Sequence, residues 1–285
     1  MRHSQIKAFH YVALLGGFSR AAEDLGLTQP AISEQVRNLE QDHDVLLFRR
    51  ERKQVHLTDA GERLFLLTKQ YFEIEQRMAE DLTRHRDALQ GELRIIADSA
   101  YHVTDILHRF RQKFPKVTVS LRSGNTDEIL AELRAYNAEI GVVGSIAPHN
   151  DLFAKDLGSS AIVAFAQKGM CRNAQSGMAI RTIADFPLIF REQGSKTRTQ
   201  VVEAAKKQGV ALHPAVVAEG REAVREMVLS GAGIGFVSEA EFGNDDRLEI
   251  IQITDLDVEM SESIVHLNAR NDVRLIRAFM DAIDP

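Results

Sequence analysis

The chain has 285 residues, a formal net charge of −6 and 44% hydrophobic residues. This length corresponds to more than one domain of ordinary size, and the hydrophobic fraction is ample for a packed core. The acidic balance counts against a protein that coats nucleic acid regardless of sequence, so any such contact must come from a local basic patch. The lack of Trp counts against aromatic platforms for sugars.

Cysteine content and hydropathy indicate the compartment. The single cysteine, Cys171, excludes an intrachain disulfide framework. The opening residues, MRHSQIKAFHYV, do not contain the apolar segment of a secretory signal. The sequence also has no apolar run long enough to span a bilayer. We therefore expect a cytoplasmic protein with no membrane partner.

Residues 4–42 predict three short helices. The first is expected over residues 5–15 and ends at Gly16. The second is expected to begin at Ser19, a residue type favoured at N-caps, and to end at Gly26. Helices joined by a glycine-containing turn are typical of the helix-turn-helix motif. The side chains predicted to face inward are Ile6, Phe9, Val12, Ala13, Ala21, Ala22 and Leu25.

The third helix combines a buried face with a polar one. Thr28 is expected to cap it, and Pro30 fits its first turn, where a missing N–H is tolerated. Helical spacing predicts that Ile32, Val36 and Leu39 are buried and that Gln29, Ser33 and Arg37 share the opposite face. Side chains of these polar types can reach base edges in the major groove. The alternative is an ordinary capped helix with a solvated face.

A basic hairpin is predicted directly after this helix. The segments VLLF (45–48) and QVHL (54–57) have the character of short strands. The basic residues between them are Arg49, Arg50, Arg52 and Lys53. Such a wing would supply phosphate contacts that the overall composition does not, and its presence beside the polar helix favours DNA binding over a solvated turn.

A long helix is predicted over residues 58–89, with Thr58 as its cap. Apolar side chains recur along it at steps of three and four, namely Leu64, Leu67, Tyr71, Ile74, Met78 and Leu82. The stripe is narrow and the remaining faces are polar, which favours pairing with a second copy of the helix. Packing of the stripe on the chain's own C-terminal part is the alternative.

After a break at Gln90-Gly91, strands and helices alternate. The first set is ELRIIAD, a helix near 102–113, VTVSLRS, a helix near 126–137 and EIGVVG. The second set is PLIFRE, a helix near 196–208, AVVAEG, a helix near 221–230 and GIGFVS, and a last helix is expected near 272–282. With AIVAFAQ as a crossing strand, this pattern predicts a bilobed α/β domain with a ligand cleft between its lobes.

The dense pattern from FHYVALLGGFSRAAEDLGLTQPAISEQVRNLEQDHDVLLFRR to VHLTDAGERL resembles the DNA-binding domain of LysR-type transcriptional regulators. The long helix and the bilobed remainder also resemble this family. The resemblance implies a winged helix-turn-helix domain (1–58), a linker and dimerisation helix (59–90) and a periplasmic-binding-protein-like effector domain (91–285). It implies no enzymatic activity, no metal and no cofactor, an operator in double-stranded DNA, a dimer of dimers, and RNA polymerase as a further partner.

The resemblance also assigns DNA contacts. It places Gln29, Pro30, Ser33 and Arg37 at bases or in the groove and Arg50, Arg52 and Lys53 at the DNA backbone, and the full predicted set adds Ser19, Arg20, Thr28 and Arg49. One departure is the acidic group Glu40, Asp42 and Asp44 near the end of the third helix, which we expect to weaken nonspecific affinity.

Four loops are expected to line the effector cleft, because ligands of such domains bind at the carboxyl ends of the strands. The predicted residues are Ser99, Ala100, Tyr101, Asn125, Thr126, Gly194, Ser195, Thr197 and Arg221. Helix starts rich in hydroxyls and amides favour anions, with Lys196, Arg198 and Arg221 adding charge nearby. We therefore predict a small anionic effector. The alternative is that these residues only cap their helices.

A weaker likeness concerns the stretches MRHSQIKAFH and EQGSKTR, which resemble regulators associated with aminoethylphosphonate catabolism. A phosphonate is therefore the expected type of anion. Two other classes of protein fit less well. An enzyme is disfavoured because GAGIGF follows a predicted helix and enters a strand, the reverse of a dinucleotide loop. An exported solute-binding protein would need a signal segment and would not need residues 1–57.

Overall fold

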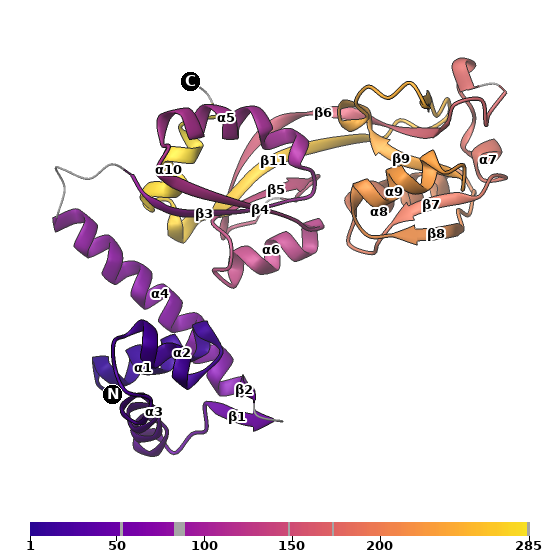
Figure 1. The fold of residues 1–285 in the computed structure, drawn as a ribbon. Helices are drawn as coiled ribbons and strands as arrows, with labels where there is room; N and C mark the ends of the chain where they lie inside the picture. The colour runs from indigo at the N-terminus through magenta and orange to yellow at the C-terminus, as the bar shows by residue number, and fades with distance from the viewer. Residues whose placement is uncertain (52–53, 83–88, 148, 173, 284–285) are drawn as a thin grey trace. The chain divides into compact units, whose positions relative to one another are not determined.

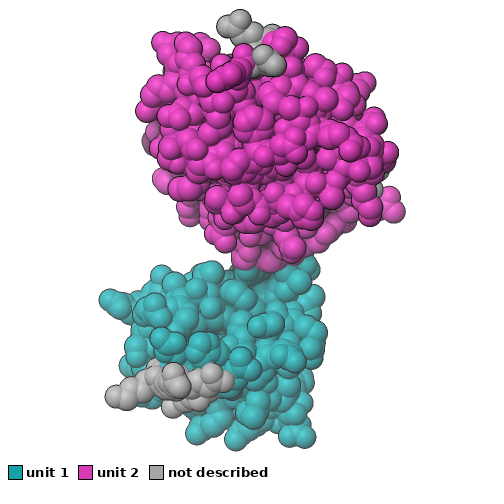
Figure 2. Space-filling view, turned by 90° about the vertical axis from the view of Figure 1, so that its right-hand side faces the viewer, with its two compact units in different colours: residues 1–87 teal, residues 88–285 magenta. Residues whose placement is uncertain are grey.

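The computed structural model describes residues 1–51, 54–82, 89–147, 149–172 and 174–283. The chain divides into two compact units, residues 1–87 and residues 88–285, coloured separately in Figure 2. The N-terminal unit is helical with a small hairpin, and the C-terminal unit is α/β (Figure 1). None of the helices in the described ranges combines the length and apolar character needed to cross a bilayer.

The three predicted helices are present as α1 (His3–Leu15), α2 (Phe18–Asp24) and α3 (Gln29–His43). Gly16 ends α1 with a φ of 64°, a left-handed conformation that glycine adopts without strain. Of the predicted inward set, Leu25 is half-buried but packs against the core, whereas Ile6 and Ala13 are half-buried and lie outside the core cluster. Two polar side chains of α1 are buried instead, namely Gln5 and His10.

The predicted N-cap of α2 is also wrong. Gly17 occupies the N-cap position, and Ser19 lies inside the helix with an exposed side chain. The helix begins two residues earlier than predicted, and the half-buried Phe18 at its start faces the ring of Phe48, with ring centroids 5.6 Å apart. Packing of an aromatic ring therefore outweighs the local preference for a serine cap.

The wing consists of β1 (Phe48–Glu51) and β2 (Gln54–Leu57), paired antiparallel with Phe48 opposite Leu57. The second strand is as predicted, whereas the first begins three residues later than expected. Residues 45–47 are held differently, because the carbonyl of Leu47 accepts from the Thr58 N–H at 3.0 Å. Arg49 and Arg50 therefore lie within the strand and not at the tip, and Arg52 and Lys53 lie outside the described residues.

The long helix α4 spans Asp59–Leu82, and its predicted continuation over residues 83–88 lies outside the described residues. Thr58 caps it as predicted, with its hydroxyl accepting from the Gly61 N–H at 3.1 Å. Leu64, the first residue of the predicted stripe, packs against the N-terminal core, whereas the stripe beyond it is exposed in the single chain, by 59% at Leu67, 52% at Ile74 and 56% at Met78. Tyr71 and Leu82 are exposed as well. The stripe thus needs another surface to cover it.

The C-terminal unit contains one nine-stranded sheet in the order β4-β3-β5-β11-β6-β9-β7-β8, with β10 paired to β6. A first parallel group comprises β3 (Gly91–Ala97), β4 (Val117–Ser123) and β5 (Ile140–Gly144), with helices α5 (Thr104–Lys113) and α6 (Thr126–Arg134). A second comprises β7 (Leu188–Arg191), β8 (Pro214–Ala218) and β9 (Ile234–Ser238), with α8 (Lys196–Lys207) and α9 (Gly220–Leu229). We call these groups the first and second lobes. This confirms the predicted bilobed α/β architecture.

Two long antiparallel strands connect the lobes. They are β6 (Leu152–Gln167), which extends the predicted crossing strand, and β11 (Glu259–Leu267), which sequence reasoning missed. β11 pairs with β5 on one side and with β6 on the other, and its register with β6 shifts between Glu262 and Ser263. In Figure 1 both strands run from one lobe into the other. The unit also contains helix α7 (Ile180–Ile183), the short strand β10 (Leu248–Ile251) and the last helix α10 (Arg274–Met280).

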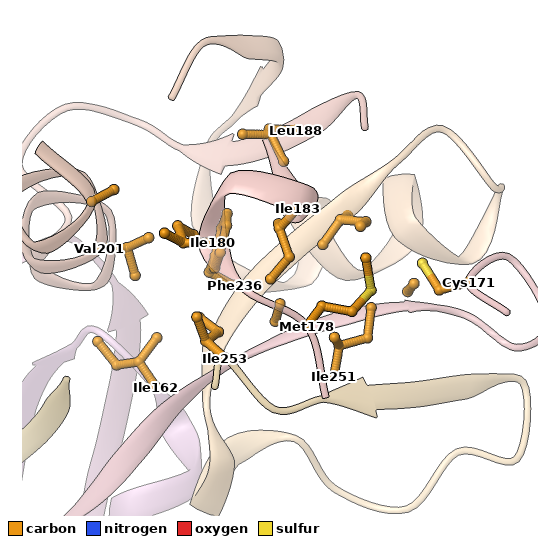
Figure 3. Close-up of a cluster of buried hydrophobic side chains, with 14 of the residues drawn as sticks. Ile162, Cys171, Met178, Ile180, Ile183, Leu188, Val201, Phe236, Ile251 and Ile253 are labelled. Carbon is orange, nitrogen blue, oxygen red and sulfur yellow. The ribbon is translucent and has the colours of Figure 1, made fainter. Parts of the chain in front are cut away.

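Each lobe has its own hydrophobic core. Figure 3 shows the larger core of the second lobe, where Ile180, Leu188 and Phe236 gather between the sheet and its covering helices. Cys171 belongs to this cluster and is only 5% exposed. Burial, followed by the nearby Glu249 carboxylate, raises the pKa of its thiol above the ordinary value. A buried thiol with a raised pKa is a poor nucleophile, which favours a structural role for Cys171.

Candidate functional site

The exposed face of α3 is the first candidate site. Ile32, Val36 and Leu39 are buried as predicted, and Gln29, Pro30 and Arg37 are exposed on the other side. The Thr28 hydroxyl accepts from the Ala31 N–H at 3.4 Å, which caps the helix. The Gln29 side-chain amide donates to the Ser33 hydroxyl at 2.7 Å. The structure therefore places a pre-arranged pair of neutral polar groups on the first turns of the helix.

The acidic residues near the end of α3 have internal partners. The Glu40 carboxylate accepts from the backbone N–H groups of Leu47 at 2.7 Å and Phe48 at 3.2 Å, which leads the chain into β1. The Asp42 carboxylate accepts from the Gln5 amide at 3.0 Å. Asp44 adopts a left-handed conformation with a φ of 48° and ends the helix. Two of these three acidic side chains thus hold the unit together.

The remaining candidates of the N-terminal unit flank α3. Ser19 and Arg20 are exposed on α2, and the Arg20 guanidinium donates to the Gly16 carbonyl at 2.9 Å. Arg49 is exposed on β1 opposite His56, and Arg50 is the next residue of the strand. The predicted contacts of Arg52 and Lys53 fall outside the described residues.

In the C-terminal unit, two predicted helix starts from different lobes meet. Asn125 caps α6 by accepting from the Glu128 N–H at 3.1 Å, and its amide donates to the Gln193 carbonyl at 3.5 Å. Gly194 has a φ of +91°, and a Cβ there would lie 2.7 Å from Asn125 Oδ1. Ser195 is fully buried and caps α8 by accepting from the Arg198 N–H at 3.5 Å. The N-termini of α6 and α8 therefore lie beside each other.

Thr126 and Thr197 stand at these same helix starts and are both buried. The Thr126 hydroxyl donates to the Gly144 carbonyl at 3.5 Å. At the end of β3, Ser99 caps a short 3₁₀ helix by accepting from the Tyr101 N–H at 3.2 Å, Ala100 is half-buried, and Tyr101 is 52% exposed. The predicted hydroxyl-rich strand ends thus lie mostly inside the unit.

Charged residues that the sequence did not single out gather at the ends of β3, β7 and β9. The buried Arg191 guanidinium donates to the Asp98 carboxylate and, at 2.8 Å, to Glu192. Burial alone would lower the pKa of Arg191, but the carboxylates of Asp98 and Glu192 raise it above its ordinary value. The guanidinium therefore remains charged. Arg221, a predicted effector residue, has Nη1 3.8 Å from a Glu241 carboxylate oxygen and donates to the Glu241 carbonyl.

Two further side chains, His102 and Glu262, lie beside Glu241. The His102 imidazole lies 2.9 Å from a Glu241 oxygen and 3.8 Å from a Glu262 oxygen. Burial, then the neighbouring Glu241 and Asp98 carboxylates, raises the pKa of Glu262 to about 8. The sequence signal for part of this group is a charged residue directly after an apolar run, as in RIIAD and LIFRE. His102, Glu241 and Glu262 had no such signal.

Comparison with known proteins places these features in a family. Residues 3–62 match the family described as "Bacterial regulatory helix-turn-helix protein, lysR family", and residues 86–284 match the "LysR substrate binding domain". The HTH-type transcriptional activator CmpR of Synechocystis sp. is 27% identical over 236 residues, which cover 82% of this chain and 78% of that protein.

Two solved structures share the fold over nearly the whole chain. A full-length OxyR variant from Pseudomonas aeruginosa has a TM-score of 0.80 at 20% identity, with 99% of this chain and 94% of that chain covered. Full-length CbnR in complex with its target DNA has a TM-score of 0.68 at 21% identity, with 99% of each chain covered.

Proposed function

This chain belongs to the LysR family of DNA-binding transcriptional regulators, which are not enzymes, and we propose that it recognises its operator through the exposed face of α3. We further propose that a small anionic effector, bound in the C-terminal unit, modulates that recognition. In this proposal, residues 1–58 bind DNA, residues 59–90 form the dimer and residues 91–285 bind the effector. RNA polymerase is proposed as a further partner.

The Gln29–Ser33 pair is the main observation that supports DNA recognition by α3. Both side chains lie on the first turns of α3, the part of a recognition helix that enters the major groove. An amide and a hydroxyl can each donate and accept hydrogen bonds at base edges. Arg37 on the same face would contact bases or the groove, whereas Arg20 and the wing residues Arg49, Arg50, Arg52 and Lys53 would neutralise phosphates and hold the helix in register. Ser19, Thr28 and Pro30 complete the proposed surface.

Replacing Gln29 or Ser33 with alanine is expected to reduce discrimination between operator and unrelated DNA by about 1–3 kcal/mol, because one base contact is lost. Arg50→Ala should weaken binding to all sequences and lower the salt slope by about one. Fluorescence anisotropy with operator and scrambled duplexes over a range of salt concentrations measures both effects. Gln41→Ala, an exposed change on the last turn of α3, is the matched control. Unchanged discrimination in both α3 variants would refute the assignment.

The exposed stripe of α4 supports self-association. Its side chains at Leu67, Tyr71, Ile74 and Met78 recur at coiled-coil spacing and are exposed within the chain. A second copy of α4 would cover them and bring two recognition helices onto one duplex. Successive major grooves lie about 34 Å apart, which sets the separation that such a dimer must match. Two such dimers would make the proposed dimer of dimers.

The proposed anion site lies where the N-termini of α6 and α8 meet. Each helix start carries partial positive charge from its unpaired N–H groups, so two adjacent starts reinforce each other. Lys196 lies at the same place, with its ammonium 4.0 Å from Asp127. A phosphonate, which offers two negative charges and several acceptor oxygens, is the first anion to test. The resemblance of MRHSQIKAFH and EQGSKTR to regulators of aminoethylphosphonate catabolism points to the same class.

Removing the Ser195 hydroxyl is expected to weaken anion binding by roughly 0.5–1.5 kcal/mol, because a hydroxyl that accepts at the helix cap can still donate to a ligand. Calorimetry with phosphonates, phosphate, sulfate and small carboxylates measures this for wild type and Ser195→Ala. Ser230→Ala removes a hydroxyl that bonds the Met227 carbonyl at the far end of α9 and serves as the control. If only neutral or cationic compounds bind, the proposal of an anionic effector is refuted. Equal anion binding by wild type and Ser195→Ala would remove Ser195 from the site.

A further inference from the structure

Side chains from three separate parts of the C-terminal unit converge on one point. His102 belongs to the 3₁₀ helix Ala100–Val103 of the first lobe, Glu241 to the 3₁₀ helix Glu239–Glu241 after β9 of the second lobe, and Glu262 to the connecting strand β11. One ligand atom from each lies within 4.8 Å of the other two. The His102 Nε2 atom is 2.9 Å from Glu241 Oε1 and 3.8 Å from Glu262 Oε1.

Ordinary pairing within the fold accounts for two of the three groups but not for the third. His102 and Glu241 form a hydrogen-bonded pair, and Arg221 lies close to Glu241. Glu262 is only 5% exposed, and among the described residues its Oε2 atom has no hydrogen-bond partner. A buried oxygen without a partner loses its hydration and gains nothing in return. The Oε2 atom of Glu262 is therefore available to a bound hydrogen-bond donor or to a cation.

The surrounding charges favour a cation over an anion at this point. Two guanidiniums are nearby, and each already faces carboxylates: Arg191 faces Asp98 and Glu192, and Arg221 faces Glu241 and Glu222. The carboxyl groups at this point thus outnumber the two guanidiniums, which favours a cation as the further ligand. The anion site proposed at Asn125, Gly194 and Ser195 contains none of the three converging residues, although two other predicted effector residues, Ser99 and Arg221, contact Glu241.

We propose that His102, Glu241 and Glu262 bind one divalent transition-metal ion, of which Zn²⁺ and Mn²⁺ are representatives. One imidazole nitrogen and two carboxylate oxygens are a donor set that such ions accept, with water completing the coordination. Ligand atoms about 2.0–2.2 Å from a shared ion lie within about 4.4 Å of each other. Both measured separations from His102 satisfy this limit.

An ion at this point would join both lobes to the strand that connects them. Because its ligands come from η1 (Ala100–Val103), η3 (Glu239–Glu241) and β11, any change in the angle between the lobes would alter their separation. The ion would therefore favour one lobe arrangement by its differential affinity for that arrangement. This role is additional to the proposed function and does not depend on the effector being an anion.

The test uses the full chain without an affinity tag, treated with a chelator and then dialysed against buffered free Zn²⁺ or Mn²⁺. We expect the wild type to retain about one more ion per chain than Glu262→Gln, whose binding at this site should fall at least about tenfold. His102→Gln and Glu241→Gln should behave like Glu262→Gln. His108→Gln changes an exposed histidine that contacts Gln112 and controls for surface binding. In a parallel melting experiment, the metal should raise the Tm of the wild type and of His108→Gln only.

Equal metal content and equal Tm shifts for wild type and Glu262→Gln would overturn the proposal, leaving adventitious surface binding only. If Glu262→Gln does not fold, the metal content of His102→Gln and Glu241→Gln tests the site instead. A wild type that retains no metal overturns the proposal by itself. The dialysis contains neither DNA nor anionic effector. Its failure would therefore leave the proposed function standing, and failure of the anion calorimetry would leave the metal site standing.

Discussion

Asp98→Ala is expected to lower the free energy of unfolding of the C-terminal unit by about 3–5 kcal/mol, the cost of leaving a buried charge without its partner. Asp98 and Arg191 are only 9% and 8% exposed, and the guanidinium donates directly to the carboxylate. Without Asp98, the positive charge of Arg191 would lose its buried partner and keep its ion pair with the partly exposed Glu192. Urea unfolding of the full chain, followed by circular dichroism, measures the change.

A double variant distinguishes the effect of losing the whole Asp98–Arg191 ion pair from the effect of leaving one of its charges unpaired. Asp98→Leu combined with Arg191→Met removes both charges, and we expect it to be far more stable than Asp98→Ala, because buried ion pairs can be replaced by apolar groups at little cost. Asp151→Ala is the control, since it breaks the exposed pair with Arg134 (2.8 Å) and should cost less than about 1 kcal/mol. If Asp98→Ala and Asp151→Ala lower the free energy of unfolding by the same amount, the buried ion pair contributes no more to stability than the exposed one.

Tyr71→Asp combined with Ile74→Asp is expected to separate chains that associate through α4. In the proposed dimer these side chains lie in the seam, where each buried carboxylate would cost several kcal/mol, on the order of the effective desolvation penalty of an ion. Within one chain they are 42% and 52% exposed, so the change should leave the folded N-terminal unit intact. Light scattering at micromolar concentration gives the mass, and circular dichroism checks the fold.

The matched control places the same charge on another face of the helix. Ile74→Asp alone should already weaken association, whereas Gln76→Asp, two positions further and exposed, should keep the mass of the wild type. The same mass for the double variant and the wild type would exclude α4 as the interface. DNA affinity should fall together with the mass, because two linked recognition helices bind one duplex more tightly than either alone.

The helical part of the fold could be predicted because its signals are local. Thr28, Pro30 and the Ile32–Val36–Leu39 spacing together determine α3 within fifteen residues. The prediction was wrong where a distant contact decides. Ser19 is not a cap, since Phe18 packs on Phe48 thirty positions away. The first wing strand begins late because Glu40 and Thr58 hold residues 46–48.

Strand β11 and the charged cluster escaped prediction for the same reason. The segment EMSESIVHL mixes polar and apolar residues, and it becomes a strand by pairing with β5 and β6, about a hundred positions earlier. Asp98 and Arg191 are 93 positions apart, and His102 and Glu241 are 139 apart. The helix starts at Asn125 and Ser195 could be identified because capping is local. Their meeting across two lobes could not.

The β6–β11 ribbon also determines what kind of motion the effector domain can make. The two lobes are joined by a pair of strands matched from Leu152–Leu267 to Ala161–Glu259, and not by a loose linker. Such a ribbon resists sliding, because sliding would break its ladder of hydrogen bonds, but it tolerates twist about its length. Its one irregularity, between Glu262 and Ser263, is where twist concentrates most easily. The ribbon therefore permits twisting about its length more easily than sliding. We expect ligand binding to either lobe to rotate one lobe relative to the other about the ribbon.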